Sequence, residues 1–423
     1  MPTMEPATIG NVVWHKDDKW PSEALQFLGR MKTAASWNCL HVSCQDVSFC
    51  PAPATLAGVQ RSREVCSIAR ENGVVMGPLA TAPHDRDWRQ RINGLAPDAR
   101  TRLVQRAEAA PLFAHAYAFH LNFRFGGMTP LDLAKFAHGQ GLAGLKIHVV
   151  DGEAASLNAM SPGDLRAFGE QVARLGLEIH VETSTTERAG LSDAVARALA
   201  VGATSLRCYP LYEGRVSEIV SRTIEDLRLL QQLDPEGRLR FTLEQHEDLK
   251  SDELVRIVEA VDNPKLSLLF DFGNMINAYE MPLPALARQS RYITEVHVKD
   301  CFIKPDRGGW AHLACVSGEG HLPMHAMLVE LLLLGKQRPQ VLAFGLEEEE
   351  GYFAPALRWP AQGPDPFIAA RTPSYTEIGA TDLASRLRQE TAAAQAQVQT
   401  IRSMLRDIAW QAQGSSYAHA RNG

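Results

Sequence analysis

The chain has 423 residues, of which 45% are hydrophobic and 22% are charged. These values are ordinary for a water-soluble protein, and the length suits one large α/β domain with extensions or two domains. The formal net charge of −6 gives no electrostatic support for nucleic acid or an anionic membrane as a partner.

The amino-terminal part, residues 1–112, lacks the basic start and apolar core of a signal peptide. Its apolar runs alternate between strand-like and helix-like periods, which predicts an α/β extension. The seven cysteines of the chain contain no CxxC pair, as is typical of a reduced set of thiols. We therefore expect a cytoplasmic protein without membrane segments.

Residues 113–353 contain eight short apolar runs with the length and composition of buried strands. Amphipathic helical patterns separate them, and several of these begin at capping residues. Eight such βα units predict a closed (β/α)8 TIM barrel, with residues 1–112 packed outside its ring. The predicted strands are 115–122, 144–150, 177–183, 204–210, 240–244, 266–271, 293–297 and 341–347.

The carboxyl-terminal part, residues 354–423, begins with a Pro- and Gly-rich linker over 354–373. A helix is predicted over 381–411, and a disordered tail follows it. One apolar stripe runs along this helix and indicates either a core contact or a homo-oligomer contact; it consists of Leu383, Leu387, Ile401, Leu405 and Ile408.

The last four predicted strands each end at a side chain that can bind a metal ion. These residues are Glu244, Asp271, His297 and Glu347. The carboxyl ends of barrel strands meet at one face, where such folds build active sites. A single acid or histidine at a strand end is usually a capping or solvated group, but four on consecutive strands indicate a site. Carboxylates with one imidazole suit Mn²⁺ first, then Mg²⁺, Co²⁺ or Zn²⁺.

Two questions within this site stay open in the sequence. Glu347 begins a run of four glutamates, so Glu349 is the alternative fourth ligand. Glu244 and Glu347 could also face a substrate from two sides, which makes both candidates for acid–base catalysis. Other polar residues share the faces of these strands or lie beside them, and we expect them to contact the substrate; they are His148, His180, Glu182, Arg207, His246, Asn274 and Lys299.

Four motifs surround these positions: FTLEQHE, LLFDFGN, EVHVKD and VSGEGHLP. With them, the stretch from about residue 113 to 350 resembles the xylose-isomerase-like TIM barrels, the superfamily of sugar (phosphate) isomerases and epimerases. The resemblance implies that Glu244, Asp271, His297 and Glu347 are the four metal ligands. It also implies that the ion binds adjacent oxygens of a small carbohydrate while a carboxylate moves a proton through an enediolate.

The chain departs from the ketose 3-epimerases of that superfamily at two positions. Those enzymes have a histidine three residues after the metal-binding aspartate and an arginine six residues after the metal-binding histidine. This chain has Asn274 and Ile303 there. An isomerase or epimerase is the first hypothesis, and a lyase, such as a dehydratase or decarboxylase, is the alternative. An AP-endonuclease-like DNA-repair enzyme and an inactive binding subunit are two further hypotheses.

Overall fold

A computed structural model describes residues 87–349, 351–370, 374–375 and 383–420. The strands and helices predicted within the first 86 residues lie outside the described residues. The first described elements are the helices α3 (Asp87–Asn93) and α4 (Pro97–Glu108).

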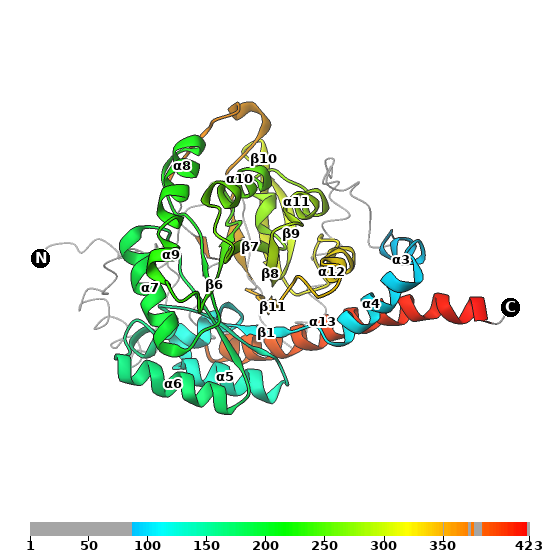
Figure 1. Cartoon of the computed structure of the whole chain (residues 1–423), viewed down its shortest axis with the longest axis horizontal. Coiled ribbons are helices and arrows are strands. Elements are labelled where there is room, and N and C mark those ends of the chain that lie inside the picture. Colours follow the sequence, from blue (N-terminus) through cyan, green and yellow to red (C-terminus); the bar gives the residue numbers. More distant parts are fainter. Residues whose placement is uncertain (1–86, 350, 371–373, 376–382, 421–423) are drawn as a thin grey trace, which may run out of the picture. The chain divides into compact units, whose positions relative to one another are not determined.

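Eight parallel strands form a closed barrel, in the order β1-β11-β8-β7-β6-β4-β3-β2 (Figure 1). Seven of them fall on runs predicted as strands, and β1 shares only His115 with the predicted run 115–122; the TIM barrel is confirmed. The ring closes where Ala114 of β1 pairs with Leu346 of β11. The strands are β1 (Leu112–His115), β2 (Gly144–His148), β3 (Glu178–Glu182), β4 (Ser205–Cys208), β6 (Arg240–Glu244), β7 (Leu266–Asp271), β8 (Ile293–Val298) and β11 (Ala343–Leu346).

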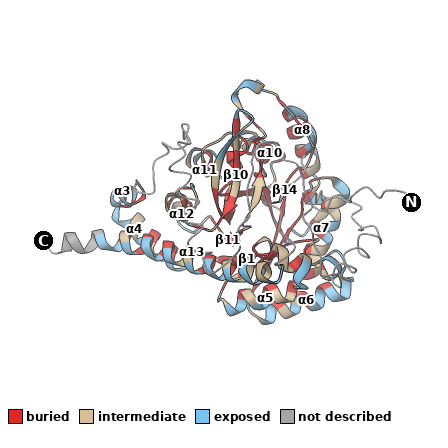
Figure 2. Ribbon diagram, turned by 180° about the vertical axis from the view of Figure 1, so that it is seen from behind, coloured by how far each residue is buried: buried red, intermediate tan, exposed pale blue. Residues whose placement is uncertain are grey.

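Helices surround the ring and bury one face each, while their outer faces carry exposed residues (Figure 2). Thr129 and Ser161 start α5 and α6 with capping boxes, in which side chain and backbone groups satisfy each other's hydrogen bonds. The helices that follow the first seven barrel strands are α5 (Pro130–Gly139), α6 (Pro162–Arg174), α7 (Arg188–Val201), α8 (Val216–Leu227) with the short α9 (Leu230–Leu233), α10 (Ser251–Val261), α11 (Pro282–Gln289) and α12 (Met324–Leu333).

The predicted carboxyl-terminal helix is α13 (Leu383–Ala420). It packs along α4 and against β11, and Ile401 and Ile408 of its apolar stripe are fully buried. Gln397 Nε2 donates to the Val298 carbonyl at 2.9 Å. Arg402 Nη2 donates to the Gln140 carbonyl at 2.6 Å, just past α5. The central part of the stripe is therefore a core contact of the barrel, and α13 takes the position of its eighth helix.

The first strand, predicted over 115–122, lies earlier in the chain, at Leu112–His115. The strand ends at His115, and the chain continues as a 3₁₀ helix η2 (Ala116–Phe119) and a π-helix η3 (Asn122–Gly126). The Glu390 carboxylate of α13 accepts hydrogen bonds from the backbone N–H groups of Leu121 (2.7 Å) and Asn122 (2.8 Å). These contacts supply hydrogen-bond partners for backbone groups that lie outside the barrel sheet. The alternation of apolar and polar residues in the sequence does not reveal such partners.

A small antiparallel sheet follows β8 and was not predicted. It consists of β9 (Asp300–Asp306), β10 (Gly309–Cys315), β12 (Tyr352–Ala354) and β14 (Ser374–Tyr375). The predicted linker also contains β13 (Phe367–Ile368), which pairs with β5 (Gly214–Arg215). Three 3₁₀ turns complete the described elements, namely η4 (Glu153–Ala155), η5 (Asn274–Ile276) and η6 (Pro360–Gln362).

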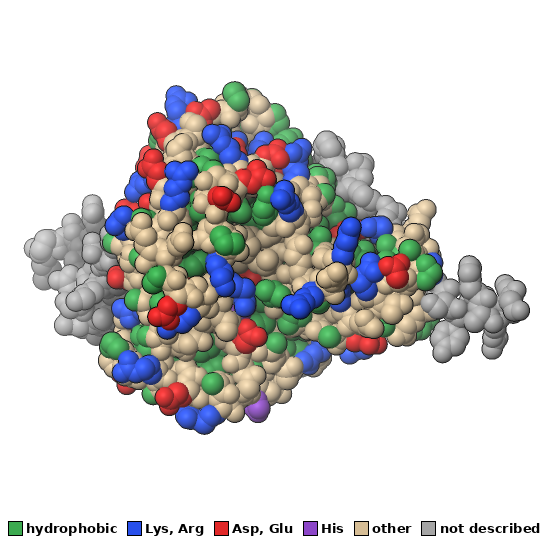
Figure 3. Space-filling model, in the orientation of Figure 1, with side chains coloured by type: hydrophobic (Ala, Val, Ile, Leu, Met, Phe, Trp, Pro, Cys, Tyr) green, Lys and Arg blue, Asp and Glu red, His purple; other side chains and the backbone are tan. Residues whose placement is uncertain are grey.

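On the face seen in Figure 3, basic and acidic side chains are interspersed. Within the described residues, each helix is too short or too polar to cross a bilayer.

Candidate metal centre

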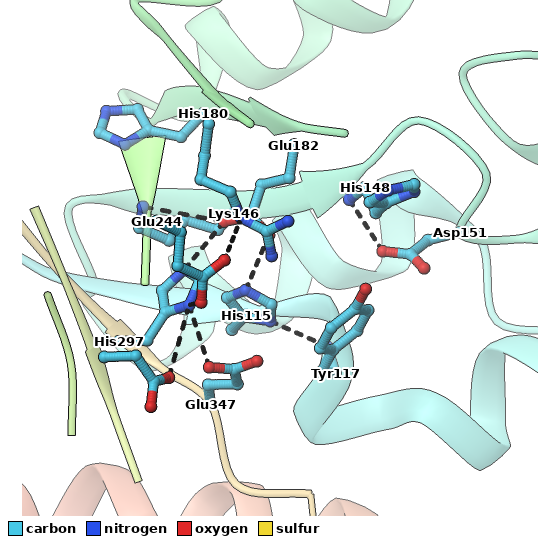
Figure 4. A network of polar contacts seen from close by, with 12 residues as sticks. His115, Tyr117, Lys146, His148, Asp151, His180, Glu182, Glu244, His297 and Glu347 are labelled. Carbon is cyan, nitrogen blue, oxygen red and sulfur yellow. Dashed lines mark hydrogen bonds and ion pairs between the residues drawn. The ribbon is translucent and has the colours of Figure 1, made fainter. Parts of the chain in front are cut away.

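The four residues predicted as ligands lie together at the carboxyl end of the barrel (Figure 4 draws Glu244, His297 and Glu347). One possible ligand atom from each lies within 4.8 Å of the others. His297 Nδ1 is at the centre, 3.0 Å from Glu347 Oε2, 3.2 Å from Glu244 Oε1 and 3.9 Å from Asp271 Oδ2. Glu347 follows the end of β11, and its backbone N–H donates to the Val298 carbonyl at 3.0 Å. The backbone pairing of two neighbouring strands thus holds Glu347 beside His297.

One atom of each candidate ligand is buried without a hydrogen bond in the described part of the chain. These atoms are Glu244 Oε2, Asp271 Oδ2, His297 Nδ1 and Glu347 Oε2. Unpartnered buried polar atoms are rare in folded proteins and call for an explanation. Asp271 Oδ2 and Glu347 Oε2 face His297 Nδ1, and Glu244 presents its other oxygen, Oε1, to the same nitrogen. This donor set fits a single divalent cation.

The electrostatics of the cluster agree with this fit. Burial raises the pKa of Asp271 to about 7, and the carboxylates of Glu347 and Glu244 add to that effect against the opposing charge of Lys299. Burial lowers the pKa of His297, but Glu347, Glu182 and Glu244 raise it well above its ordinary value. Without a cation, the cluster therefore holds protons to offset its negative charge.

Glu182 orients His297. Its Oε1 lies 2.9 Å from His297 Nε2, while its Oε2 lies 3.1 Å from His115 Nε2 and 2.7 Å from Arg207 Nη2. Its side chain is fully buried. The prediction that Glu182 contacts the substrate does not fit this placement, because both of its oxygens are already engaged by protein groups.

Three further predicted residues hold Glu244 and Asp271. Arg207 Nε lies 3.0 Å from Glu244 Oε2, and Asn274 Nδ2 donates to Glu244 Oε1 at 3.3 Å. Lys299 Nζ donates to Asn274 Oδ1 at 2.9 Å and lies 3.0 Å from Asp271 Oδ2. Burial alone would raise the pKa of Glu244, but Arg207 and His297 bring it down to about 2. Glu244 is therefore ionised and firmly positioned.

A second polar layer lies beneath these residues inside the barrel. Glu295 of β8 accepts a hydrogen bond from Lys146 and another from Ser205, and His180 Nδ1 lies 3.0 Å from its carboxylate. His180 is 1% exposed, so its predicted contact with substrate does not fit this position. Glu295 was missed, although it precedes His297 by two residues and so shares its face.

Gly345 makes this layer possible. A Cβ atom at that position would lie 2.5 Å from Lys146 Cδ and 3.3 Å from His297 Cδ2. The glycine in the middle of β11 therefore leaves room for the lysine side chain to cross the barrel below the ligand cluster.

His148 and His246 lie at the same end of the barrel, in a different group of contacts. His148 Nε2 lies 2.9 Å from Ser184 Oγ, and burial lowers the pKa of His148 to about 3. Tyr209 donates to the same Ser184 hydroxyl at 2.8 Å, and the His246 ring stacks on Tyr209 with centroids 3.8 Å apart.

The alternative ligand Glu349 lies outside the cluster. β11 ends at Leu346, so the strand does not continue to bring Glu349 onto the face of Glu347. Glu349 Oε1 instead lies 3.8 Å from His120 Nδ1. The intervening Glu348 accepts a hydrogen bond from the Ser317 N–H at 2.8 Å. The geometry thus favours Glu347.

Asp300 organises the glycine-rich loop of the VSGEGHLP motif. Its Oδ2 accepts from the N–H groups of Gly318 and Gly320, both at 2.9 Å, and its Oδ1 accepts from Leu322 N–H at 3.3 Å. A Cβ atom on Gly320 would lie 2.1 Å from this carboxylate, which explains the glycine. Asp300 is the last residue of the EVHVKD motif. Its role in holding the glycine-rich loop is visible only in the folded structure.

Comparisons with known proteins place this barrel in a family. Residues 134–359 match the family described as xylose isomerase-like TIM barrel, and the chain belongs to that family. The Escherichia coli (strain K12) protein YihM, described as uncharacterized, is 45% identical over 308 residues, which cover 73% of this chain and 94% of YihM.

Two further similarities are more distant. The 3-oxo-isoapionate decarboxylase of Pectobacterium atrosepticum is 24% identical over 216 residues, covering 50% of this chain and 77% of that enzyme. The structure of D-psicose 3-epimerase with D-tagatose from Clostridium cellulolyticum is 14% identical, with a TM-score of 0.48, over 70% of this chain and 99% of that one.

Proposed function

We propose that this protein is a divalent-metal-dependent enzyme that acts on a small sugar, keto-sugar or sugar acid through an enediolate. The observation that carries the proposal is the clustering of four buried candidate ligands, Glu244, Asp271, His297 and Glu347, each with one buried atom that has no hydrogen bond among the described residues. The three carboxylates and one imidazole favour Mn²⁺ ahead of Mg²⁺, Co²⁺ and Zn²⁺. A cation held there would stabilise the negative charge that develops on oxygens next to the reacting carbon.

We assign different roles to the residues of the site. Glu244 has Asn274 and Arg207 at its two oxygens, so we assign it to holding the cation. Glu347 is the better-placed proton carrier, since its side chain is 7% exposed, against 1% for Glu244. Lys299, 3.8 Å from Glu347 Oε2, can pair with an anionic group of the substrate or intermediate.

An isomerase or epimerase is the first candidate reaction, because proton transfer at carbon next to a carbonyl needs only a base and a stabilised oxyanion. A decarboxylase is the second candidate. Asn274 stands where the ketose 3-epimerases have a histidine, and Lys299, which donates to it, suits a substrate carboxylate. The similarity to an oxo-acid decarboxylase supports this second candidate.

One experiment separates the candidates. The Mn²⁺-loaded protein would be incubated in D₂O with a panel of ketopentoses, ketohexoses and keto sugar acids, and followed by NMR and CO₂ release. Deuterium entering an otherwise intact carbon skeleton would establish an isomerase or epimerase. Deuterium entering a product that has lost CO₂ would establish a decarboxylase.

The variant Glu347→Gln tests the proton carrier in that assay. With the metal retained, we expect turnover to fall by roughly 10²–10⁴-fold, the usual contribution of a positioned base. A change of only a few-fold in kcat with a raised KM would assign Glu347 to binding and move the base to Glu244. Exchange with none of the compounds, by a protein that binds its metal, would argue against enediolate chemistry.

A further inference from the structure

His312 is a buried histidine outside the ligand cluster with one nitrogen fixed and the other unbonded. It lies on β10 in the hairpin that leaves the barrel after β8, opposite Ile303 of β9. β10 packs against η5, the turn that also carries Asn274. The side chain is fully buried, and Nε2 has no hydrogen-bond partner among the described residues.

The hydrogen bonds of Asn277 determine which nitrogen of His312 carries the proton. Asn277 Nδ2 donates to the carbonyls of Ala354 and Pro355, both at 2.8 Å. The remaining Asn277 atom, Oδ1, lies 2.7 Å from His312 Nδ1. Since Oδ1 can only accept, Nδ1 donates its proton, and Nε2 of the neutral ring carries a lone pair.

The contact of β10 with η5 and the hydrogen bond to Asn277 place the ring beside the turn that carries Asn274, on the side of the candidate site. Burial lowers the pKa of His312 well below its ordinary value, and the charges of Lys299 and His246 lower it further against the effect of Glu347. All three neighbours lie at the carboxyl end of the barrel. The ring of Tyr352 packs 5.9 Å away, between centroids, and its hydroxyl donates to Glu247 at 2.6 Å. His312 is thus neutral and near the cluster without touching a candidate ligand.

A histidine that served only to fill space would not need a fixed tautomer in which the acceptor atom Nε2 has no hydrogen-bond donor. Leaving a buried acceptor unsatisfied carries a desolvation cost, which a hydroxyl donor removes. A polyhydroxylated substrate bound at the cluster would bring such donors into this space.

We infer that Nε2 of His312 accepts a hydrogen bond from a substrate hydroxyl that is not one of the two oxygens at the ligand cluster, and that His312 thereby selects polyhydroxylated substrates. This inference rests on the proposed function. It adds a residue that determines specificity through a neutral acceptor, with Asn277 as the residue that positions it.

Two substitutions separate the nitrogens. His312→Asn keeps a polar group near the position of Nδ1 and removes Nε2, whereas His312→Gln places a polar group near the position of Nε2. His138→Asn, on the exposed surface of α5, serves as the control. Each variant would be checked for metal content and thermal unfolding, and then assayed by deuterium exchange with the panel compound that the wild-type protein turns over and with its singly deoxygenated analogues.

We expect His312→Asn to lower kcat/KM by about tenfold, mainly through KM, and His312→Gln to recover part of the loss. One deoxygenated analogue should lose about the same factor with the wild-type protein and little with His312→Asn, because the same hydrogen bond is removed from either side. Unchanged kcat/KM in a folded His312→Asn variant, or equal losses for every analogue in both proteins, would overturn the inference alone. Absence of exchange with every panel compound by the metal-loaded wild-type protein would overturn the proposed function, and the inference with it.

Discussion

Glu182 Oε1 lies 2.9 Å from His297 Nε2, on the opposite edge of the imidazole from the three carboxylates that surround Nδ1. A carboxylate in this position fixes the tautomer and orientation of a metal-binding histidine and increases its basicity. Arg207 and His115 in turn hold Glu182. This contact leaves Nδ1 of His297 facing the three carboxylates, as the proposed metal site requires.

The first prediction concerns this carboxylate. Glu182→Gln should weaken the affinity for Mn²⁺ by about 10–100-fold, the usual effect of removing such a partner. Competition with a fluorescent chelator measures this affinity. Glu170→Gln, on the exposed face of α6, is the control and should change nothing. An unaltered Mn²⁺ affinity in a folded Glu182→Gln protein would mean that Glu182 does not orient a ligand.

The second prediction concerns the space beneath the cluster. Gly345→Ala should destabilise the protein by about 1–3 kcal/mol, because the new methyl group overlaps Lys146 in a packed interior. Urea unfolding gives the free energy. Gly139→Ala, at the end of α5 with no atom within 4 Å of the added Cβ, should be neutral or slightly stabilising. Equal effects of the two substitutions would show that Lys146 does not fill this space.

The third prediction follows from the loop around Asp300. Burial raises the pKa of Asp300 to about 6, although backbone N–H groups oppose the shift. The folded protein then holds this proton more tightly than the unfolded chain does. Stability due to Asp300 is therefore full below pH 4 and falls as the pH rises to about 6, by about 3 kcal/mol.

Asp300→Asn removes the titrating group and provides the comparison. The difference in unfolding free energy between wild type and variant, measured by urea titration from pH 4 to pH 7, should fall as the pH rises. A difference that rises over this range would show that the loop stabilises the ionised form.

The sequence was sufficient to predict the barrel and the four candidate ligands, since both depend on short-range patterns. Each of β6, β7 and β8 is an apolar run that carries its polar residue at or near the end, and parallel strands bring those ends together. The hairpin of β9 and β10 was missed although its turn is local, at Arg307 and Gly308, which both have positive φ.

The contacts of the residues that support the candidate ligands could not be predicted, because the residues they contact are distant in sequence. Lys146 and Glu295 are 149 residues apart, and neither position shows that the other lies opposite. For His180 and Glu182 the sequence predicted the face that they share, but the layer that each occupies within the barrel depends on packing. His312 is identified only through Asn277 and its two backbone contacts.

The fourth prediction concerns the charge beside the cluster. Lys299→Met should strengthen Mn²⁺ binding by about tenfold, because it removes a positive charge 3.0 Å from Asp271, and should lower turnover. Isothermal titration with Mn²⁺ and the exchange assay measure the two effects. Lys304→Met, exposed on β9, should leave both unchanged. Weaker Mn²⁺ binding in a folded Lys299→Met protein would show that Lys299 supports the metal site and does not compete with the ion.

The metal content of the purified protein tests the central claim most directly. Equilibrium dialysis against Mn²⁺ followed by elemental analysis should give one ion per chain for the wild-type protein and almost none for the double variant with Glu244→Gln and Asp271→Asn, with circular dichroism spectra unchanged. The loss is expected because these substitutions remove two of the three charged donors. A wild-type protein that binds no divalent ion, or a double variant that retains a full equivalent, would contradict the assignment of this cluster as the metal centre.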